Sequence, residues 1–116
     1  MEALAHTEAD VSADIIIRRV EGDEMYPEMP AGSLVQVEPC DRIAGGGGTY
    51  LVEFDGIPLL QTVQRLPGRR LRLTSQNSSF EDIIIRQDED GWVTEEGGHP
   101  VLFKVVGRFV GLAGLD

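Results

Sequence analysis

The 116-residue sequence contains only one cysteine and two histidines. A single thiol, Cys40, excludes an internal disulfide and is typical of a protein from a reducing cytoplasm. Cys40, His6 and His99 do not stand at the spacing of metal ligands, and a zinc site needs three or four converging ligands. The glycine run 45–48 lacks the Lys-Ser/Thr pair that a phosphate-binding loop requires. We therefore expect neither a metal ion nor a cofactor.

Long hydrophobic runs are also absent. The apolar runs are short, such as 15–17 and 83–85, whereas a membrane helix needs about 20 residues. The first 14 residues are acidic and have no apolar segment of a secretory signal. We expect a cytoplasmic protein that does not enter a membrane, with residues 1–14 as a linker or tail and residues 15–116 as one domain.

Basic residues are few. Ten Lys and Arg face twenty Asp and Glu, which gives a net charge of −10 and a pI near 4.5. Nucleic-acid binders need clustered cations to displace counterions, so we do not expect this chain itself to bind duplex DNA. Four arginines crowd into "RLPGRRLR" at 65–72, which we interpret as the solvated tip of a hairpin.

What the sequence does contain is strand after strand of alternating apolar and β-branched residues. The predicted strands cover residues 14–21, 33–38, 49–54, 57–66, 69–75, 83–86 and 101–110. Asp55-Gly56 predicts a tight hairpin turn, and Pro67-Gly68 predicts a second turn. We interpret 45–48 as a flexible connection and 87–98 as a polar connection, and we expect a helical turn at 24–29. The predicted fold is mostly β, with antiparallel strands and short helical turns.

One strand carries an exception to its own pattern. In the segment 57–66, Gln61 falls in a row with the apolar Leu59 and Val63. A buried amide in that row needs a hydrogen-bond partner, because an unpaired polar group costs roughly 1–3 kcal/mol. The alternative interpretation is that Gln61 is exposed to solvent at the edge of the sheet.

Five motifs in order carry a resemblance over residues 15–111. They are Gly22-Asp23-x-Met25-x-Pro27, the Gly32 turn, Asp55-Gly56, Leu73-x-Ser75-x-Asn77 with Phe80, and Gly107-Arg108. In this combination the sequence resembles the C-terminal domain of the LexA and phage-repressor family. Its members are self-cleaving serine peptidases related in fold to signal peptidase.

The resemblance implies a catalytic dyad at two positions of this chain. The family has a serine nucleophile after the Gly-Asp pair and a lysine base on the strand after the Asp-Gly turn. Here these positions hold Glu24 and Gln61, so the resemblance implies a pseudo-peptidase that has lost its dyad. No Ala-Gly bond, the usual cleavage target, precedes Gly22. We expect the two exchanged residues to meet at the edge of a cleft, where the Glu24 carboxylate has two options. It can turn to solvent, or, in the hypothesis we follow, it can accept a hydrogen bond from the Gln61 side-chain amide.

The resemblance also implies a binding role, because in the family this domain holds repressor subunits together while a separate N-terminal domain reads the operator. We expect a homodimer or higher homo-oligomer that contacts DNA only through such a missing domain. The last apolar strand offers the interface candidates, which are Val101, Phe103, Val105, Phe109 and Leu112. Two alternatives stay open: an active self-cleaving peptidase with substituted residues, and a stand-alone acidic decoy or antirepressor that binds another repressor.

Overall fold

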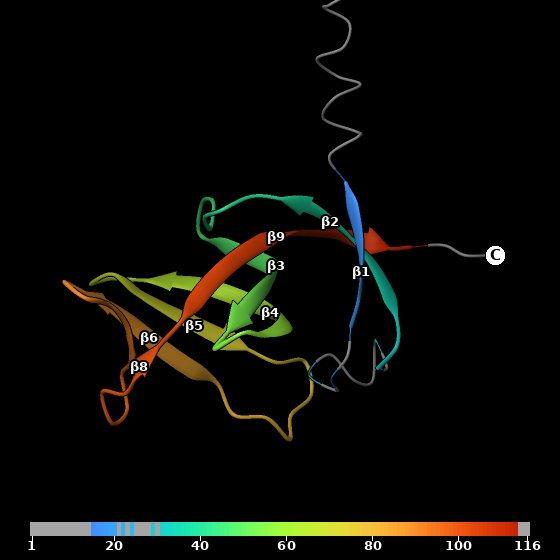
Figure 1. Cartoon of the computed structure of the whole chain (residues 1–116). Coiled ribbons are helices and arrows are strands. Elements are labelled where there is room, and N and C mark those ends of the chain that lie inside the picture. The colour runs from blue at the N-terminus through green and yellow to red at the C-terminus, as the bar shows by residue number, and fades with distance from the viewer. Residues whose placement is uncertain (1–14, 21, 23, 25–28, 30, 114–116) are drawn as a thin grey trace, which may run out of the picture.

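The strands of the protein join into one antiparallel sheet. The computed structural model describes residues 15–20, 22, 24, 29 and 31–113, and its nine strands in this part of the chain pair in the order β1-β2-β9-β3-β4-β5-β6-β7-β8 (Figure 1). Their bounds are β1 Ile16–Arg19, β2 Leu34–Pro39, β3 Gly47–Phe54, β4 Ile57–Leu66, β5 Arg70–Thr74, β6 Ile83–Asp88, β7 Gly91–Thr94, β8 Pro100–Val101 and β9 Phe103–Leu112. This confirms the predicted antiparallel β fold.

The two predicted turns form as hairpins. Asp55 and Gly56 both have positive φ, at 53° and 85°, as the favoured two-residue hairpin turn requires, and they join β3 to β4. Gly68 and Arg69 also have positive φ where β4 turns into β5. Local sequence therefore fixes the register of β3, β4 and β5.

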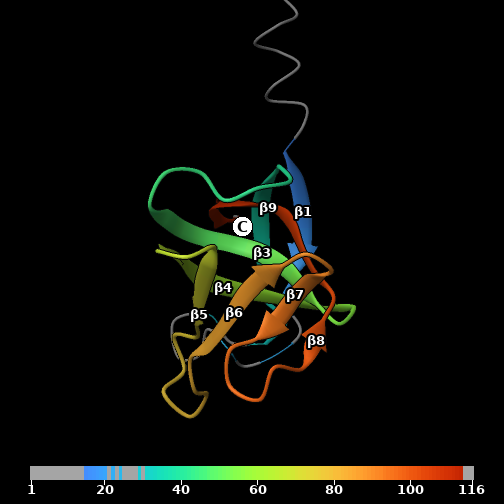
Figure 2. The same cartoon turned by 90° about the vertical axis from the view of Figure 1, so that its left-hand side faces the viewer.

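The sheet is strongly curved, and its long strand β9 bends across the whole molecule. Figures 1 and 2 show β9 running from beside β8 at one end to beside β1 and β2 at the other, with β6 and β7 at the β8 end. β9 pairs with β2 on one side and with β3 on the other. Arg108 on β9 donates a 2.6 Å hydrogen bond to Glu38 on β2, and this bond raises the pKa of Arg108 above its ordinary value, so Arg108 stays cationic.

Two apolar clusters lie on opposite faces of the curved sheet, since Tyr50 and Val52 of β3 belong to one and Leu51 to the other. The buried members of the first are Ile43, Tyr50, Val52, Val63, Leu71, Leu73, Ile85 and Val105. Those of the second are Val20, Met29, Val35, Val37, Leu51 and Leu60. Strands β3 and β4 supply residues to both clusters, so the two clusters are coupled through these strands.

The structure corrects two expectations about the strands. β7 forms inside the segment 87–98, where we expected a connection; its Trp92 and Val93 pair with Gln87 and Arg86. Gly47 begins β3, although we expected a flexible link at 45–48. A Cβ on Gly47 would lie 2.1 Å from the Val63 carbonyl oxygen, so only glycine lets β3 approach β4 this closely.

β9 is central in the strand order, but its two halves are paired on different sides. It pairs with β3 over Phe103–Arg108 and with β2 over Gly107–Leu112, so the two pairings overlap only at Gly107 and Arg108. The edges of the sheet are β1 and β8.

Some expectations fall outside the described residues. The tail at 1–14 does, and so does most of the helical turn expected at 24–29; the part of the chain that the structure describes contains no helix. Accordingly, these residues include no helix with the length and apolar character to cross a membrane.

Candidate functional site

Glu24 lies inside the protein. Its side chain is only 1% exposed, and its Oε2 accepts a 2.9 Å hydrogen bond from the Leu60 backbone N–H on β4. The Glu24 backbone carbonyl accepts a second hydrogen bond, of 2.9 Å, from the N–H of Asn77 in the segment after β5. Residue 24 thus ties its own segment to two others that are far away in the sequence.

Gln61 is buried as well, at 2% exposure, so it is not the edge-exposed glutamine of the alternative interpretation. Its Nε2 donates a 3.0 Å hydrogen bond to the Ser75 hydroxyl and a 3.3 Å hydrogen bond to the Leu60 carbonyl. Ser75 directly follows β5 at Thr74. The amide therefore has two acceptors, which removes most of the penalty for burying it.

The structure brings Glu24 and Gln61 to the same place but gives each a different partner from the one we expected. Glu24 accepts from the N–H of Leu60, whereas Gln61 donates to the carbonyl of Leu60. The expected amide-to-carboxylate hydrogen bond is wrong: Gln61 Nε2 donates elsewhere, Glu24 Oε2 accepts from Leu60, and the buried Glu24 Oε1 has no hydrogen-bond partner among the described residues. The peptide groups of Leu60 therefore link the two residues.

Glu24 Oε1 instead faces the backbone of Gly22. A Cβ on Gly22 would lie 2.5 Å from this oxygen. The glycine therefore makes room for the carboxylate, in the same Gly-Asp motif that carried the resemblance.

The sequence pattern predicted that a buried Gln61 needs a hydrogen-bond partner, but it did not identify Leu60 or Ser75 as the partners. Ser75 belongs to one of the five motifs, and that was the available signal. The Leu60 peptide carries no such signal, because a main-chain donor can be placed only once strands and loops are arranged in space.

Comparison with known proteins identifies the family. The model of a family described as "Peptidase S24-like" matches residues 2–95. The chain belongs to the peptidase S24-like family. The matched S24-like region includes Glu24, Gln61 and Ser75, as well as the strands from β1 to β7.

The S24-like chain is also similar to a plant protein. It is 28% identical over 75 residues to putative protease Do-like 14 of Arabidopsis thaliana, and this alignment covers 61% of the chain but 18% of the plant protein. The chain thus spans less than a fifth of that relative.

The structure places the five interface candidates of this S24-like domain in different environments. Val105 is buried in the first cluster, and Val101 and Phe103 pack against the same cluster. Phe109 packs against the second cluster, and Leu112 is 55% exposed. Val110, which we did not single out, is 47% exposed, so Val110 and Leu112 carry the apolar surface at the end of β9.

Within residues 15–113, so far as the structure describes them, no three His, Cys, Asp or Glu side chains converge as metal ligands would. Cys40 is half-buried and donates from its thiol to the Arg42 carbonyl at 3.5 Å.

Proposed function

We propose that this S24-like domain is a non-cleaving oligomerisation and regulatory module of a LexA-like or phage-type repressor. The observation that carries the proposal is the burial of the Glu24 carboxylate, which accepts a hydrogen bond from the Leu60 N–H. By the resemblance, position 24 corresponds to the family's serine nucleophile. In this interpretation the peptidase site has become a structural contact.

The chemistry of the two residues supports the absence of peptidase activity. A serine nucleophile acts only when a base takes its proton, and a lysine base must be held close by in a desolvated site. A carboxylate has no proton to give and is a weak nucleophile, and the Gln61 amide is no base near neutral pH. Lys104, the only lysine in the sequence, is exposed on β9 rather than placed in this site.

The first experiment tests activity. The purified protein is incubated between pH 7 and pH 10 and analysed by intact-mass spectrometry over days. We expect no fragment to accumulate, because neither Glu24 nor Gln61 can replace the dyad. A defined fragment that appears with time, at a rate independent of protein dilution, would mean that the chain is an active self-cleaving peptidase.

The dimer surface is proposed at the end of β9. Val110 and Leu112 are about half exposed there, and large exposed apolar side chains that lie together are typical of interaction surfaces. This half of β9 is paired with β2 on one side and lies beyond its pairing with β3, and the contact would use the exposed side chains of Val110 and Leu112. Dimerisation would raise operator affinity by engaging both half-sites at once, through a DNA-binding domain elsewhere.

The second experiment tests assembly by sedimentation velocity at micromolar concentrations. We expect a dimer that dissociates in Val110→Asp and in Leu112→Asp. Leu102→Asp is the matched control, because Leu102 is a 77% exposed leucine at the opposite end of β9. A monomeric parent protein, or a dimer that only Leu102→Asp disrupts, would contradict the proposed surface.

A further inference from the structure

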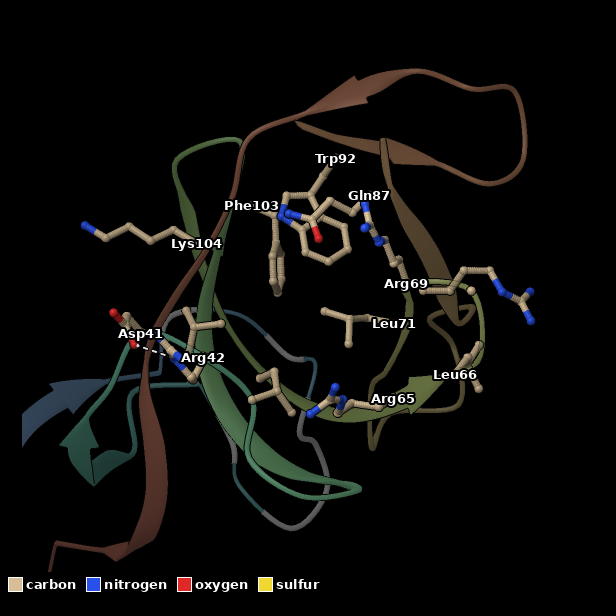
Figure 3. Close-up of a pocket in the computed structure, with 14 residues that line it drawn as sticks. Asp41, Arg42, Arg65, Leu66, Arg69, Leu71, Gln87, Trp92, Phe103 and Lys104 are labelled. Carbon is tan, nitrogen blue, oxygen red and sulfur yellow. Dashed lines mark hydrogen bonds and ion pairs between the residues drawn. The ribbon is translucent and has the colours of Figure 1, made fainter. Parts of the chain in front are cut away.

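A pocket at the β8 end of the sheet gathers the chain's cations. Its volume is about 1010 Å³, and strands β4, β5, β6, β7 and β9 line it together with the loop that precedes β3 (Figure 3). Five basic residues contribute to the lining: Arg42, Arg65, Arg69, Arg70 and Lys104. They are half of the ten basic residues in the sequence, whereas the pocket includes only one, Asp41, of its twenty acidic residues.

Most of this positive charge is not neutralised. Arg42 pairs with Asp41 at 3.3 Å, and Arg70 pairs with Glu95 at 3.1 Å. Arg65, Arg69 and Lys104 form no ion pair with any residue that the structure describes. Lys104 points away from the centre in Figure 3, so it lies at the rim. Two arginine side chains therefore remain as available anion-binding groups.

The centre of the pocket is aromatic and apolar. Figure 3 shows the Trp92 and Phe103 rings in the middle, with Leu71 nearby. The two rings pack edge to face, with centroids 5.4 Å apart and planes at 67°. Gln87 is the cross-strand neighbour of Trp92 and adds an amide that can donate and accept hydrogen bonds. The pocket thus combines guanidinium groups, a partly exposed indole and one amide.

We propose that this pocket binds a nucleoside phosphate. Guanidinium groups match phosphate oxygens in charge and planar geometry, which suits Arg65 and Arg69 to the phosphates. An aromatic side chain offers a stacking surface for a base, which suits Trp92, and Gln87 can form hydrogen bonds with the edge of the base. A pocket of this size is large enough for such a ligand.

Charge favours a small ligand over a nucleic-acid strand. The remaining half of the basic residues shares the rest of the chain with nineteen of the twenty acidic residues. This surface repels a polyanion that extends beyond the pocket, because binding of nucleic acid depends on an extended row of cations. The pocket is separate from Glu24 and Gln61, so the inference does not depend on the proposed loss of peptidase activity.

Isothermal titration calorimetry with ATP and GTP tests the inference, with Trp92 fluorescence as a second readout. Trp92 is the only tryptophan in the sequence, so a change in its fluorescence reports on this pocket. We expect saturable binding of one nucleotide per chain, weakened by added salt. Inorganic tripolyphosphate and adenosine should each bind at least about tenfold more weakly, because each lacks one half of the recognised group.

Variants locate the binding. Arg65→Gln and Arg69→Gln should each weaken ATP binding by about tenfold, the contribution of a charge-assisted hydrogen bond. Arg18→Gln on β1 is the matched control, since Arg18 is an exposed arginine outside the pocket, and it should change the affinity by less than about twofold.

Several results would overturn the inference: no binding of either nucleotide, equal affinity for tripolyphosphate, tighter binding of a single-stranded oligonucleotide, or nucleotide binding that leaves Trp92 fluorescence unchanged. Equal losses of affinity in Arg18→Gln and Arg65→Gln would reduce the effect to net charge and would also overturn it.

Discussion

The two ends of the sheet differ in whether their charged side chains are buried or open to solvent. At the end next to β1, which we call the Glu24 end, a carboxylate is enclosed in the protein and accepts one backbone hydrogen bond. At the end next to β8, the pocket end, five basic residues surround an open cavity with aromatic rings at its centre. The same sheet thus closes one site with its own side chains and leaves the other accessible.

This difference in accessibility between the two ends indicates which end of the S24-like chain is available to a ligand. At the Glu24 end, the chain's own groups occupy the positions that resemble a peptidase dyad, so a substrate would have to displace buried contacts. At the pocket end, charged groups remain without partners among the described residues, and such groups are available to a ligand.

Core truncation at each end should give the largest loss of stability. Leu60→Ala at the Glu24 end and Leu73→Ala at the pocket end each empty a fully buried site. We expect each to lower the free energy of unfolding by about 2–5 kcal/mol, measured by urea denaturation. Because β3 and β4 carry residues of both clusters, circular dichroism and Trp92 fluorescence should report one common transition. Separate transitions would show that the two ends fold independently.

Gly107 should give the next largest effect, at the point on β9 where the two ends meet. It pairs with Pro39 on β2 and with Leu51 on β3, and a Cβ there would lie 2.3 Å from Val37 Cγ1 and 2.6 Å from the Glu38 carbonyl oxygen. Gly107→Ala should therefore lose about 1–3 kcal/mol of unfolding free energy. Gly111→Ala, where a Cβ would meet nothing within 4 Å, is the matched control. Equal losses in both variants would refute the close packing of β9 on β2.

The third prediction concerns the enclosed carboxylate. Glu24→Gln keeps an acceptor for the Leu60 N–H while it removes a buried charge whose Oε1 has no partner. We expect it to raise the free energy of unfolding at pH 7 by about 1–2 kcal/mol. Glu81→Gln, at an exposed position, should change stability by less than about 0.5 kcal/mol. A destabilised Glu24→Gln variant would mean that the carboxylate itself holds this end together.

The smallest effect is expected for Ser75→Ala. The substitution removes one of the two acceptors of the Gln61 amide, so the unfolding free energy should fall by about 1 kcal/mol. Ser78→Ala, at an exposed serine of the same loop, should leave stability unchanged. If Ser75→Ala behaved like the control, the Gln61 hydrogen bonds would not contribute to the stability of the Glu24 end.

The sequence alone determined most of the strands and the β3–β4 and β4–β5 hairpins. Alternation along a strand depends on neighbouring residues, and a turn such as Asp55-Gly56 is set by the backbone angles that those two residues favour. The sequence did not predict β7, because this strand has four residues in a polar stretch and its alternation of apolar and polar residues is too short to detect. The same alternation indicated that Gln61 breaks an apolar row, and the structure confirms its burial.

The hydrogen-bond partners, the strand neighbours and the pocket contacts became known only from the tertiary structure. The peptide groups of Leu60, which lie between Glu24 and Gln61, became partners when segments 36 residues apart came together. The central place of β9 depends on pairing with β2 and β3, far away in the sequence. The arginines of 65–72 looked like a solvated hairpin tip, yet curvature of the sheet sets three of them beside Trp92, Phe103 and Arg42. Each of these arrangements arises from contacts between distant segments, and local propensity does not indicate which distant segment will form the contact.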